Sequence, residues 1–429
     1  MDEVDRTRLE QFRQLRRSIR GSEAYLIVGI DVGKEKHTAF LGTANGKTVL
    51  KRLSFANNQE GFKKLLDQAD GAKGKGGFQE IIYGLEPTAN YHKPLADFLV
   101  QLGRQVFLVA AVAVKGNRKS LDGRWDKHDG KDAANIADLI SQGKFLYYEY
   151  PDFRLRELRE LLALKRRLKR QEHSLRVRIR NHLVAKYFPE LDGHFGHSER
   201  EGLAIVRWCL DPSLLADYTF EEFRNLVTTG RRSLSQSRRL LTIWETAKDS
   251  IGCDVGAAAQ FEAKVMVEGL GQVREAIAET DRQIQERASK FPEYEYLLSL
   301  PGFGPDVSSK VLGAIGDPFR FKNGRQVLKL AGWDLNAERS GKNSDRAQPV
   351  ISKKGKADLR YALYQAALVA SSRNYGIRLY FAKKLQGRQG EPGILTKMRV
   401  KLAAKLLIIA WTLMKKKEPF NPDYLTQEE

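Results

Sequence analysis

Residues 24–55 read AYLIVGIDVGKEKHTAFLGTANGKTVLKRLSF and contain three apolar runs in close succession. The first run, residues 24–31, is almost continuously apolar, which is typical of a strand buried on both faces. Residues 37–43 and 47–55 follow as further strands, and Asn45-Gly46 between them is a strong hairpin signal. The stretch therefore predicts a meander of three strands at the start of a sheet.

Strands and helices alternate after this meander. The pattern predicts helices over 59–70, 91–102 and 131–141, and buried strands over 78–86 and 105–110. Three hairpin-like strands followed by a β-α-β-α succession is the order of an RNase H-like domain. An ordinary doubly wound fold lacks the initial antiparallel meander. Residues 24–150 are therefore expected to form one α/β domain.

The next part of the chain predicts long helices. Within residues 153–187, the stretch 154–183 carries eleven Lys and Arg against three Glu, and its leucines recur at roughly heptad spacing, at Leu158, Leu161, Leu164, Leu168 and Leu175. This pattern is typical of a coiled-coil helix with a solvated face. It is equally compatible with a dimerising helix whose basic face lies along a phosphate backbone, and we favour both together. The basic residues expected at that backbone are Lys165, Arg166, Lys169 and Arg170.

A second long helix is predicted over 257–290, able to pair with the first, and 190–255 are expected to be helical without a clearer signal. The predicted organisation has five parts. They are a basic extension (1–23), the α/β domain (24–150), a long-helix coiled-coil region (151–293), a helical C-terminal domain (294–416) and a tail (417–429). The fold class is therefore α/β plus α.

Charge is the first indication of function. The chain has 73 Lys and Arg against 53 Asp and Glu, a net charge of +20, which favours polyanionic partners and above all nucleic acid. A merely basic soluble protein and an anionic membrane surface are the alternatives, but no amphipathic lipid anchor is evident. The charged N-terminus and the lack of a long apolar segment predict a soluble, cytoplasmic protein without membrane contact. The two cysteines, Cys209 and Cys253, indicate neither a zinc site nor a disulfide framework.

Four carboxylates fall where metal chemistry requires them. Asp31 ends the first strand, Glu86 ends a later strand, and Asp129 and Asp132 open a helix with both side chains on one side. Hard divalent cations prefer carboxylate oxygens, and phosphoryl transfer commonly uses two such ions about 4 Å apart. Each residue alone has a structural interpretation as a turn cap, a loop residue or a helix cap. Together, in this order, the four predict a nuclease-like metal site.

The C-terminal domain contains two further motifs. Residues 301–305 (PGFGP) between two helical stretches resemble a helix-hairpin-helix turn that can hold a phosphate, although any Gly-Pro turn has this pattern. Ser340 precedes a glycine in a polar loop, and a serine that attacks a phosphodiester needs such access and nearby cations. Ser-Gly in a basic loop is, however, often only a flexible phosphate-binding surface, and from chemistry alone this interpretation of Ser340 is favoured over that of a nucleophile. Ser344 and Ser352 are rival nucleophiles. The cations near it in sequence are Arg339, Lys342, Arg346, Lys353, Lys354, Lys356 and Arg360.

From about Tyr25 to Lys416 the chain resembles the DEDD transposases of insertion sequence family one-ten, whose relatives include site-specific DNA invertases. The resemblance is carried by five ordered motifs. They are GIDVGKEKHTAFL, LEPTANYHKPLADFLVQLGRQVFLV, VKGNRKSLDGRWDKHDGKDAANIADLISQGKF, LPGFGPDVSSKVLGAIGDPFRF, and SGK with ISKKGKADLRYALYQAA.

The resemblance implies roles for particular residues. It implies that Asp31, Glu86, Asp129 and Asp132 are a quartet that binds Mg²⁺, with Mn²⁺ as a substitute, in a RuvC-like domain. It implies that Ser340 attacks DNA and forms a covalent phosphoserine intermediate. It further implies a noncoding guide RNA that pairs with donor and target DNA. The same resemblance implies dimers that assemble to a tetramer, in which one chain's carboxylates and another's serine complete the site.

The sequence departs from the family pattern at three points. Ala89-Asn90-Tyr91 follows the glutamate, Ala110-Ala111 follows the fifth strand, and Ala347-Gln348-Pro349 interrupts the stretch after the serine. None of these removes an expected catalytic group. Besides an RNA-guided recombinase, the alternatives are a protein-only invertase, a structure-selective nuclease and a non-catalytic nucleic-acid binder. Ser340 favours a recombinase over a nuclease, because strand exchange must conserve the phosphodiester bond energy.

Overall fold

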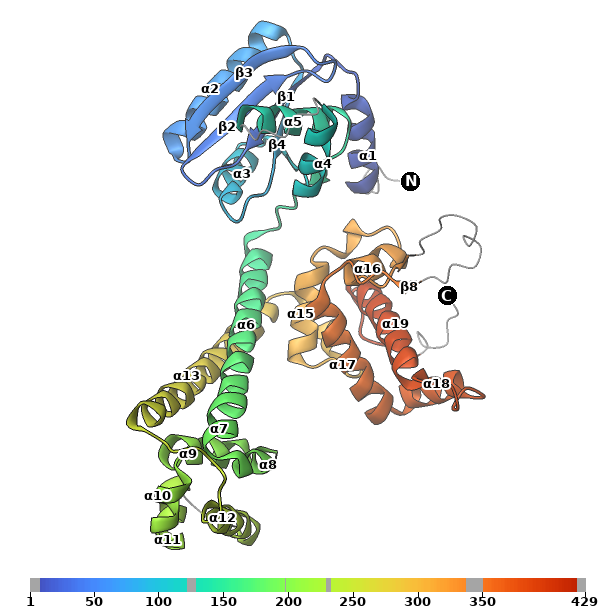
Figure 1. The fold of residues 1–429 in the computed structure, drawn as a ribbon. Coiled ribbons are helices and arrows are strands. Elements are labelled where there is room, and N and C mark those ends of the chain that lie inside the picture. Colours follow the sequence, from blue (N-terminus) through green and yellow to red (C-terminus); the bar gives the residue numbers. More distant parts are fainter. Residues whose placement is uncertain (1–7, 122–128, 197, 229–232, 337–349, 423–429) are drawn as a thin grey trace, which may run out of the picture. The chain divides into compact units, whose positions relative to one another are not determined.

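The structure, a computed structural model, describes residues 8–121, 129–196, 198–228, 233–336 and 350–422 (Figure 1). The chain divides into two compact units. The first is Met1–Asp152 together with Phe319–Lys322, and the second is Phe153–Pro318 together with Asn323–Glu429.

The first unit is a six-stranded sheet with helices on both faces (Figure 1). The strand order is β3-β2-β1-β4-β5-β6, in which β1, β4 and β5 are parallel and the other pairings are antiparallel. The strands are β1 (Tyr25–Asp31), β2 (Lys36–Gly42), β3 (Thr48–Ala56), β4 (Glu80–Leu85), β5 (Gln105–Leu108) and β6 (Leu146–Tyr147). The helices are α1 (Arg8–Ile19), α2 (Gln59–Gly76), α3 (His92–Gln101), α4 (Ala111–Leu121) and α5 (Asp129–Ser141).

Burial on both faces explains why the first strand is apolar throughout. Leu26, Val28 and Ile30 point into a core that α2 and α3 cover, whereas Ile27 belongs to a second core with α4 and α5. All of these side chains are almost fully buried, and alternate residues of a strand face opposite sides of a sheet. The predicted meander and the later predicted strands and helices are therefore present. They form an α/β unit, as expected, whose sheet has both parallel and antiparallel strands.

Three elements of this unit were not predicted from the sequence: α1, α4 and β6. The sequence of α4 alternates alanine and valine at its start and contains Gly116, which is a weak helix signal. Its contacts with α5 stabilise it, since Val114 is buried and Asn117 bonds to two side chains of α5. The expected helix over 59–70 also continues to Gly76, where Gly77 ends it in the left-handed conformation.

The second unit is built on two long antiparallel helices, α6 (Phe153–Arg178) and α13 (Ala257–Ala288). Ion pairs join Glu172 to Arg274 and Glu157 to Arg287. The earlier residue of α6 pairs with the later residue of α13, which shows that the two helices are antiparallel. The predicted pairing of the two long helices is therefore confirmed within one chain. The packing of α13 against α6 accounts for the heptad spacing of the leucines of α6 within a single chain. Dimerisation through this helix stays a prediction.

Short helices connect the far ends of this pair around their own apolar core. They are α7 (Ala185–Tyr187), which a π-helical turn joins to α6, then α8 (Asp192–Phe195), α9 (Glu199–Trp208), α10 (Pro212–Asp217), α11 (Phe220–Val227) and α12 (Leu234–Ala247). We call residues 189–256 the tip.

A helical bundle follows α13 and contains one short hairpin. Its elements are α14 (Pro292–Leu298), α15 (Pro305–Ile315), α16 (Gly324–Ala331), β7 (Leu335–Asn336), β8 (Val350–Ile351), α17 (Ala357–Arg373), α18 (Tyr375–Leu385) and α19 (Ile394–Lys416). None of the helices in the described part of the chain is long and apolar enough to cross a membrane.

Candidate functional site

Two of the predicted carboxylates leave neighbouring strands at the same edge of the sheet. β1 and β4 are parallel and paired in register, with Ile30 opposite Leu85. Asp31 is the last residue of β1, and Glu86 directly follows β4. The backbone N–H of Glu86 donates to the carbonyl of Ile30 at 3.4 Å, which extends the ladder to this point. Asp31 and Glu86 are thus adjacent in the fold although 55 residues separate them in sequence.

The third carboxylate is brought to β1 by an unusually close approach of α5. A Cβ atom on Gly29 would lie 2.2 Å from the carbonyl oxygen of Ala133 and 2.6 Å from the backbone nitrogen of Ala137. A Cβ on Gly84, the register partner of Gly29 on β4, would likewise collide with Ile140. Gly29 therefore lets the backbone of α5 pack directly on β1, and Gly84 leaves room on β4 for the side chain of Ile140. This contact holds the first turn of α5, with Asp132, against the carboxyl-terminal half of β1.

Asp132 is a buried carboxylate with an arginine partner. Its residue is only 2% exposed, and the guanidinium of Arg118 on α4 lies 2.5 Å from its Oδ1. A buried carboxylate needs such a counter-charge, because desolvation otherwise strongly penalises its charged form. Arg118 is a site residue that sequence reasoning missed. One indication of this role was available from the sequence: Arg118 lies in the same family motif as Asp129 and Asp132, a short distance before them.

Amide side chains hold α4 and α5 together beside this ion pair. The Asn117 amide donates to Asn135 Oδ1 at 2.6 Å and to Asp138 Oδ2 at 2.7 Å. The Asn135 amide in turn donates to the carbonyl of Val114 at 2.8 Å, and Asn135 is buried. Because α4 and α5 are tied in this way, the positions of Arg118 and Asp132 are coupled.

The described side chains do not form a complete metal site. Among them, no three His, Cys, Asp or Glu residues lie close enough together to hold an ion. Asp129 is the first residue of α5, but its side chain lies outside the described part of the structure. The donor set that the sheet edge gathers is nevertheless made of carboxylate oxygens, which suits a hard divalent cation rather than a soft one.

Ser340 and its nearest cations, Arg339, Lys342 and Arg346, lie outside the described residues, as does Ser344. The residues that flank this segment are β7 and β8, which pair antiparallel as Leu335 with Ile351. The rival Ser352 is committed to this hairpin stem. Its hydroxyl donates to Asp334 Oδ1 at 2.6 Å and accepts the backbone N–H of Lys354 at 3.2 Å.

Arg360 has a structural task at the base of the same hairpin. Its guanidinium donates to the carbonyls of Ala331 at 2.9 Å and Lys353 at 3.1 Å. These bonds hold the left-handed backbone of Lys353, with φ of 54°, against the end of α16. Arg360 therefore holds the base of the loop, and its expected contact with nucleic acid stays a prediction. Lys353 and Lys354 are exposed, as a phosphate contact requires.

The basic face predicted on α6 is interrupted at Lys165. This side chain is 9% exposed, and its ammonium lies 2.6 Å from Asp306 Oδ1 and also pairs with Asp281. Burial by itself would lower the pKa of Lys165, but the hydrogen bonds to the two aspartates raise it above its ordinary value. Lys165 therefore joins α6, α13 and α15 and is withdrawn from the nucleic-acid-binding set. Arg166, Lys169 and Arg170 are exposed.

The turn at 301–305 connects α14 to α15, as the sequence indicated. Gly302 has a φ of +85°, and a Cβ there would lie 2.3 Å from the carbonyl oxygen of Ala366 on α17. The first turn of α15 carries Asp306, which pairs with Lys165 and, at 2.7 Å, with Lys310. A carboxylate thus occupies the helix start that a phosphate would need, so these contacts favour the packing role of the turn.

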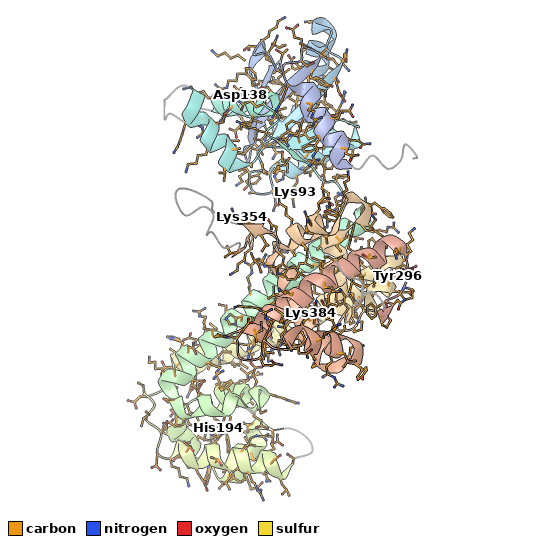
Figure 2. The ribbon with its side chains drawn as sticks, turned by 90° about the vertical axis from the view of Figure 1, so that its right-hand side faces the viewer. Lys93, Asp138, His194, Tyr296, Lys354 and Lys384 are labelled. Atoms are coloured by element: carbon orange, nitrogen blue, oxygen red, sulfur yellow. The ribbon has the colours of Figure 1, made fainter. Side chains whose placement is uncertain are left out.

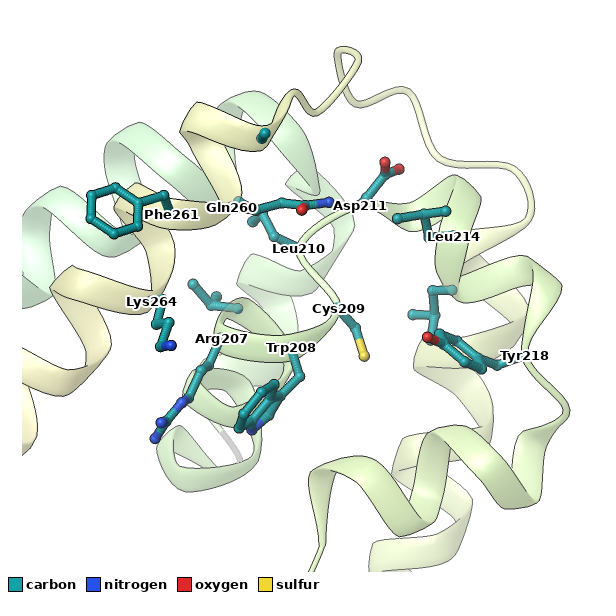
Figure 3. Close-up of a pocket in the computed structure, with 13 residues that line it drawn as sticks. Arg207, Trp208, Cys209, Leu210, Asp211, Leu214, Tyr218, Gln260, Phe261 and Lys264 are labelled. Carbon is teal, nitrogen blue, oxygen red and sulfur yellow. The ribbon is translucent and has the colours of Figure 1, made fainter.

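A surface pocket of about 430 Å³ lies at the tip, between α9, α10 and the start of α13 (Figure 3). Trp208 is 52% exposed, with the guanidinium of Arg207 4.7 Å from its ring centre, and Phe261 is 69% exposed. Burial raises the pKa of the lining Cys209 thiol to about 12, so this thiol is unreactive at neutral pH. The pocket contains none of the predicted catalytic residues.

Comparison with known proteins places both parts of the chain in one group. Residues 28–189 match a family described as "Transposase", and residues 294–382 match the family "Transposase IS116/IS110/IS902 family". The first match contains all four carboxylates, and the second contains Ser340.

Individual relatives extend this likeness over almost the whole chain. The chain is 24% identical over 417 residues to the insertion element IS116 uncharacterized 44.8 kDa protein of Streptomyces clavuligerus, covering 92% of this chain and 96% of the relative. It is 23% identical over 419 residues to the IS900 uncharacterized 42 kDa protein of Mycobacterium paratuberculosis, with the same coverage. A pilin gene-inverting protein of Moraxella lacunata is 28% identical over 153 residues, covering 34% of this chain and 46% of that protein. The chain therefore belongs to the IS110 family of insertion-element transposases.

Proposed function

We propose that this protein catalyses site-specific cleavage and strand exchange of donor and target DNA, guided by a noncoding RNA of its own element. The observation that supports the proposal is that Asp31 and Glu86 stand at the ends of two neighbouring parallel strands, while α5, which carries Asp132, packs on the same two strands. The strand order β3-β2-β1-β4-β5, with an antiparallel meander before parallel strands, supports an RNase H-like, RuvC-like domain. Family membership supports action on DNA.

The carboxylates would hold Mg²⁺, with Mn²⁺ as a substitute, through Asp31, Glu86, Asp129 and Asp132. When bound, such an ion stabilises the negative charge that develops on a phosphate under attack. The chain's own residues then have defined tasks. Arg118 pairs with Asp132 and holds it in its buried position. The Gly29 contact sets how far α5 lies from Asp31 and Glu86.

Ser340 is the proposed nucleophile. Its hydroxyl oxygen forms a bond to the scissile phosphorus while the bond from phosphorus to one DNA oxygen breaks, and the serine proton ends on that leaving oxygen. The resulting phosphoserine ester retains the energy of the DNA linkage. A hydroxyl of another strand can therefore reseal it without ATP. The hairpin stem that Ser352 and Arg360 stabilise would present the serine loop, and Lys353 and Lys354 would hold the phosphate.

The assembly proposed for this reaction is a dimer that pairs into a tetramer, with the carboxylates of one chain and the serine of another in each site. Support comes from the family resemblance and from the presence of the two groups in separately matched parts of the chain. A protein-only invertase is the second candidate, which the partial similarity to a pilin gene-inverting protein favours.

The test is denaturing gel electrophoresis of labelled DNA after reaction with full-length protein, Mg²⁺ and RNA transcribed from the flanking locus. Wild-type protein should give a protein-linked band that protease removes, whereas Ser340→Ala should give none. Ser352→Ala should still give the band, at a lower level, because it weakens the hairpin stem. Asp31→Asn and Asp132→Asn should reduce cleavage by about 100-fold or more. A band that persists in Ser340→Ala refutes the nucleophile. Cleavage that never gives a band supports a hydrolytic nuclease, and full activity without RNA supports the invertase.

A further inference from the structure

Positive charge is concentrated in one helical hairpin near the end of the second unit. Residues 373–405 contain nine Lys and Arg and a single carboxylate, Glu391. These 33 residues therefore carry +8 of the chain's net charge of +20. They comprise α18, the first half of α19 and a turn in which Gly387 and Gly393 have positive φ (Figure 1). The turn and α19 lie beyond residue 382, where the second family match ends.

The two helices pack through part of their apolar residues and leave most of the lysines exposed. Phe381 of α18 and Met398 of α19 are among the buried residues, each less than 10% exposed. Lys397, Lys401 and Lys405 recur every four residues on α19, so they share one face with a rise of about 6 Å from each to the next. Lys397 and Lys401 are exposed and Lys405 is half-buried.

Contacts with one aromatic ring, and the electrostatic influence on one carboxylate, support the view that these charges lie near each other. Lys384 of α18 and Lys405 of α19 approach the same Tyr380 ring, at 5.7 Å and 5.0 Å from its centre. The pKa of Glu391 lies below its ordinary value, chiefly because of Arg388 and further because of Lys397 and Lys401. We call Lys384, Lys397, Lys401 and Lys405 the basic row. Figure 2 labels Lys384, which marks the place of this row.

We propose that the basic row binds the phosphate backbone of duplex DNA. Four cations held in one strip repel each other in the free protein, and a polyanion of regularly spaced charges relieves that repulsion and releases its counterions. Lysine on a helix face makes phosphate contacts that position a protein on a duplex without reading its sequence. The choice of DNA as the polyanion rests on the proposed function, whereas the place of the contact rests on the hairpin itself.

The experiment compares two triple variants that lose the same charge. Lys384→Gln/Lys397→Gln/Lys401→Gln removes most of the basic row, and Lys51→Gln/Lys63→Gln/Lys75→Gln removes three exposed lysines of the first unit. Binding of full-length protein to a random-sequence DNA duplex is measured by fluorescence anisotropy between about 50 and 200 mM salt. The row variant should bind at least about 10-fold more weakly at the lower salt. Its salt slope should become shallower by up to about 2.7, which corresponds to 0.9 for each lost contact.

The control variant should keep the wild-type slope, and thermal melting should show both variants folded. Equal weakening in the two variants would overturn the proposal, because net charge alone would then explain binding. An unchanged row variant would overturn it as well. So would a slope that changes only with an RNA duplex, since the row would then be an RNA contact. Ser340→Ala and Asp31→Asn should bind DNA with the wild-type slope, so failure of the catalytic proposal is distinguishable from failure of this one.

Discussion

Replacing Gly29 by alanine tests whether backbone contact with β1 positions α5. The added Cβ would lie 2.2 Å from the carbonyl oxygen of Ala133, whereas an ordinary contact begins near 3.4 Å. The helix must therefore move by about 1.2 Å, the difference between these distances. Both colliding atoms belong to the backbone of α5, so no side-chain rotation relieves the clash. Overpacking of a core typically costs about 1–3 kcal/mol, and the upper end is expected here.

The same displacement should also lower activity. A misplacement of about 1 Å can cost about 100-fold in rate, and α5 carries Asp132. Hydrogen–deuterium exchange should report faster exchange in peptides of β1 and α5, with peptides of the second unit unchanged. DNA cleavage should fall by about 100-fold in protein that still melts cooperatively.

Gly71→Ala is the matched control. Gly71 lies on α2, and a Cβ there would meet no atom within 4 Å. Alanine is the better helix residue, so this variant should gain up to about 1 kcal/mol and cleave normally. Wild-type exchange and cleavage in Gly29→Ala would refute the reasoning. If hydrogen–deuterium exchange became faster in Gly29→Ala while DNA cleavage stayed at the wild-type rate, the packing of α5 on β1 would not matter for catalysis. The carboxylates could then not form the catalytic site at this edge of the sheet.

Two further predictions follow from buried charges. Lys165→Met should destabilise the second unit by about 1–3 kcal/mol, because it leaves Asp281 and Asp306 facing each other, whereas Arg170→Gln should leave the melting temperature unchanged. Equal melting of the two variants would contradict the structural role of Lys165. Burial holds the pKa of His37 below its ordinary value of 6.5, although the neighbouring side chain of Asn57 opposes this shift. Below about pH 6.5, His37 therefore binds a proton in the unfolded chain but not yet in the folded chain. The free energy of unfolding of the first unit should decrease as the pH falls through this range. Thermal melts across this range should show a weaker pH dependence in His37→Phe, with exposed His173→Phe as the control; no difference between the two variants would exclude His37 as the source.

Local patterns were sufficient for most of the first unit. The run of residues 24–31 predicts a strand covered on both sides, because apolar residues at successive positions must face two cores. Asn45-Gly46 likewise predicts the hairpin between β2 and β3, since its backbone suits that turn. Asp31 and Glu86 could be placed at one edge because parallel strands end on the same side of a sheet. Whether these carboxylates bind metal stays a prediction.

The sequence could not show which Lys and Arg side chains form contacts within the protein and which stay exposed. Lys165 and Arg170 occur in the same basic run of α6, but the two aspartates that bury Lys165 come from helices more than 100 residues away. Arg360 resembled the other cations near Ser340, yet it is held by two backbone carbonyls. Charge patterns report composition, whereas only three-dimensional contacts decide which charges are neutralised.

The sequence by itself predicted β1 to β5, the helices α2, α3 and α5, two long helices able to pair, and the resemblance to the IS110 family. These depend on periodicity and on motifs, which are local properties of the chain. The tertiary structure alone decided that α5 lies against Gly29, that α4 is a helix and that Arg118 neutralises Asp132. The physical reason is that a segment with a weak intrinsic helix propensity becomes a helix when it packs against a neighbouring helix. A buried carboxylate likewise needs a cation close to it, and only the tertiary fold determines which cation lies there.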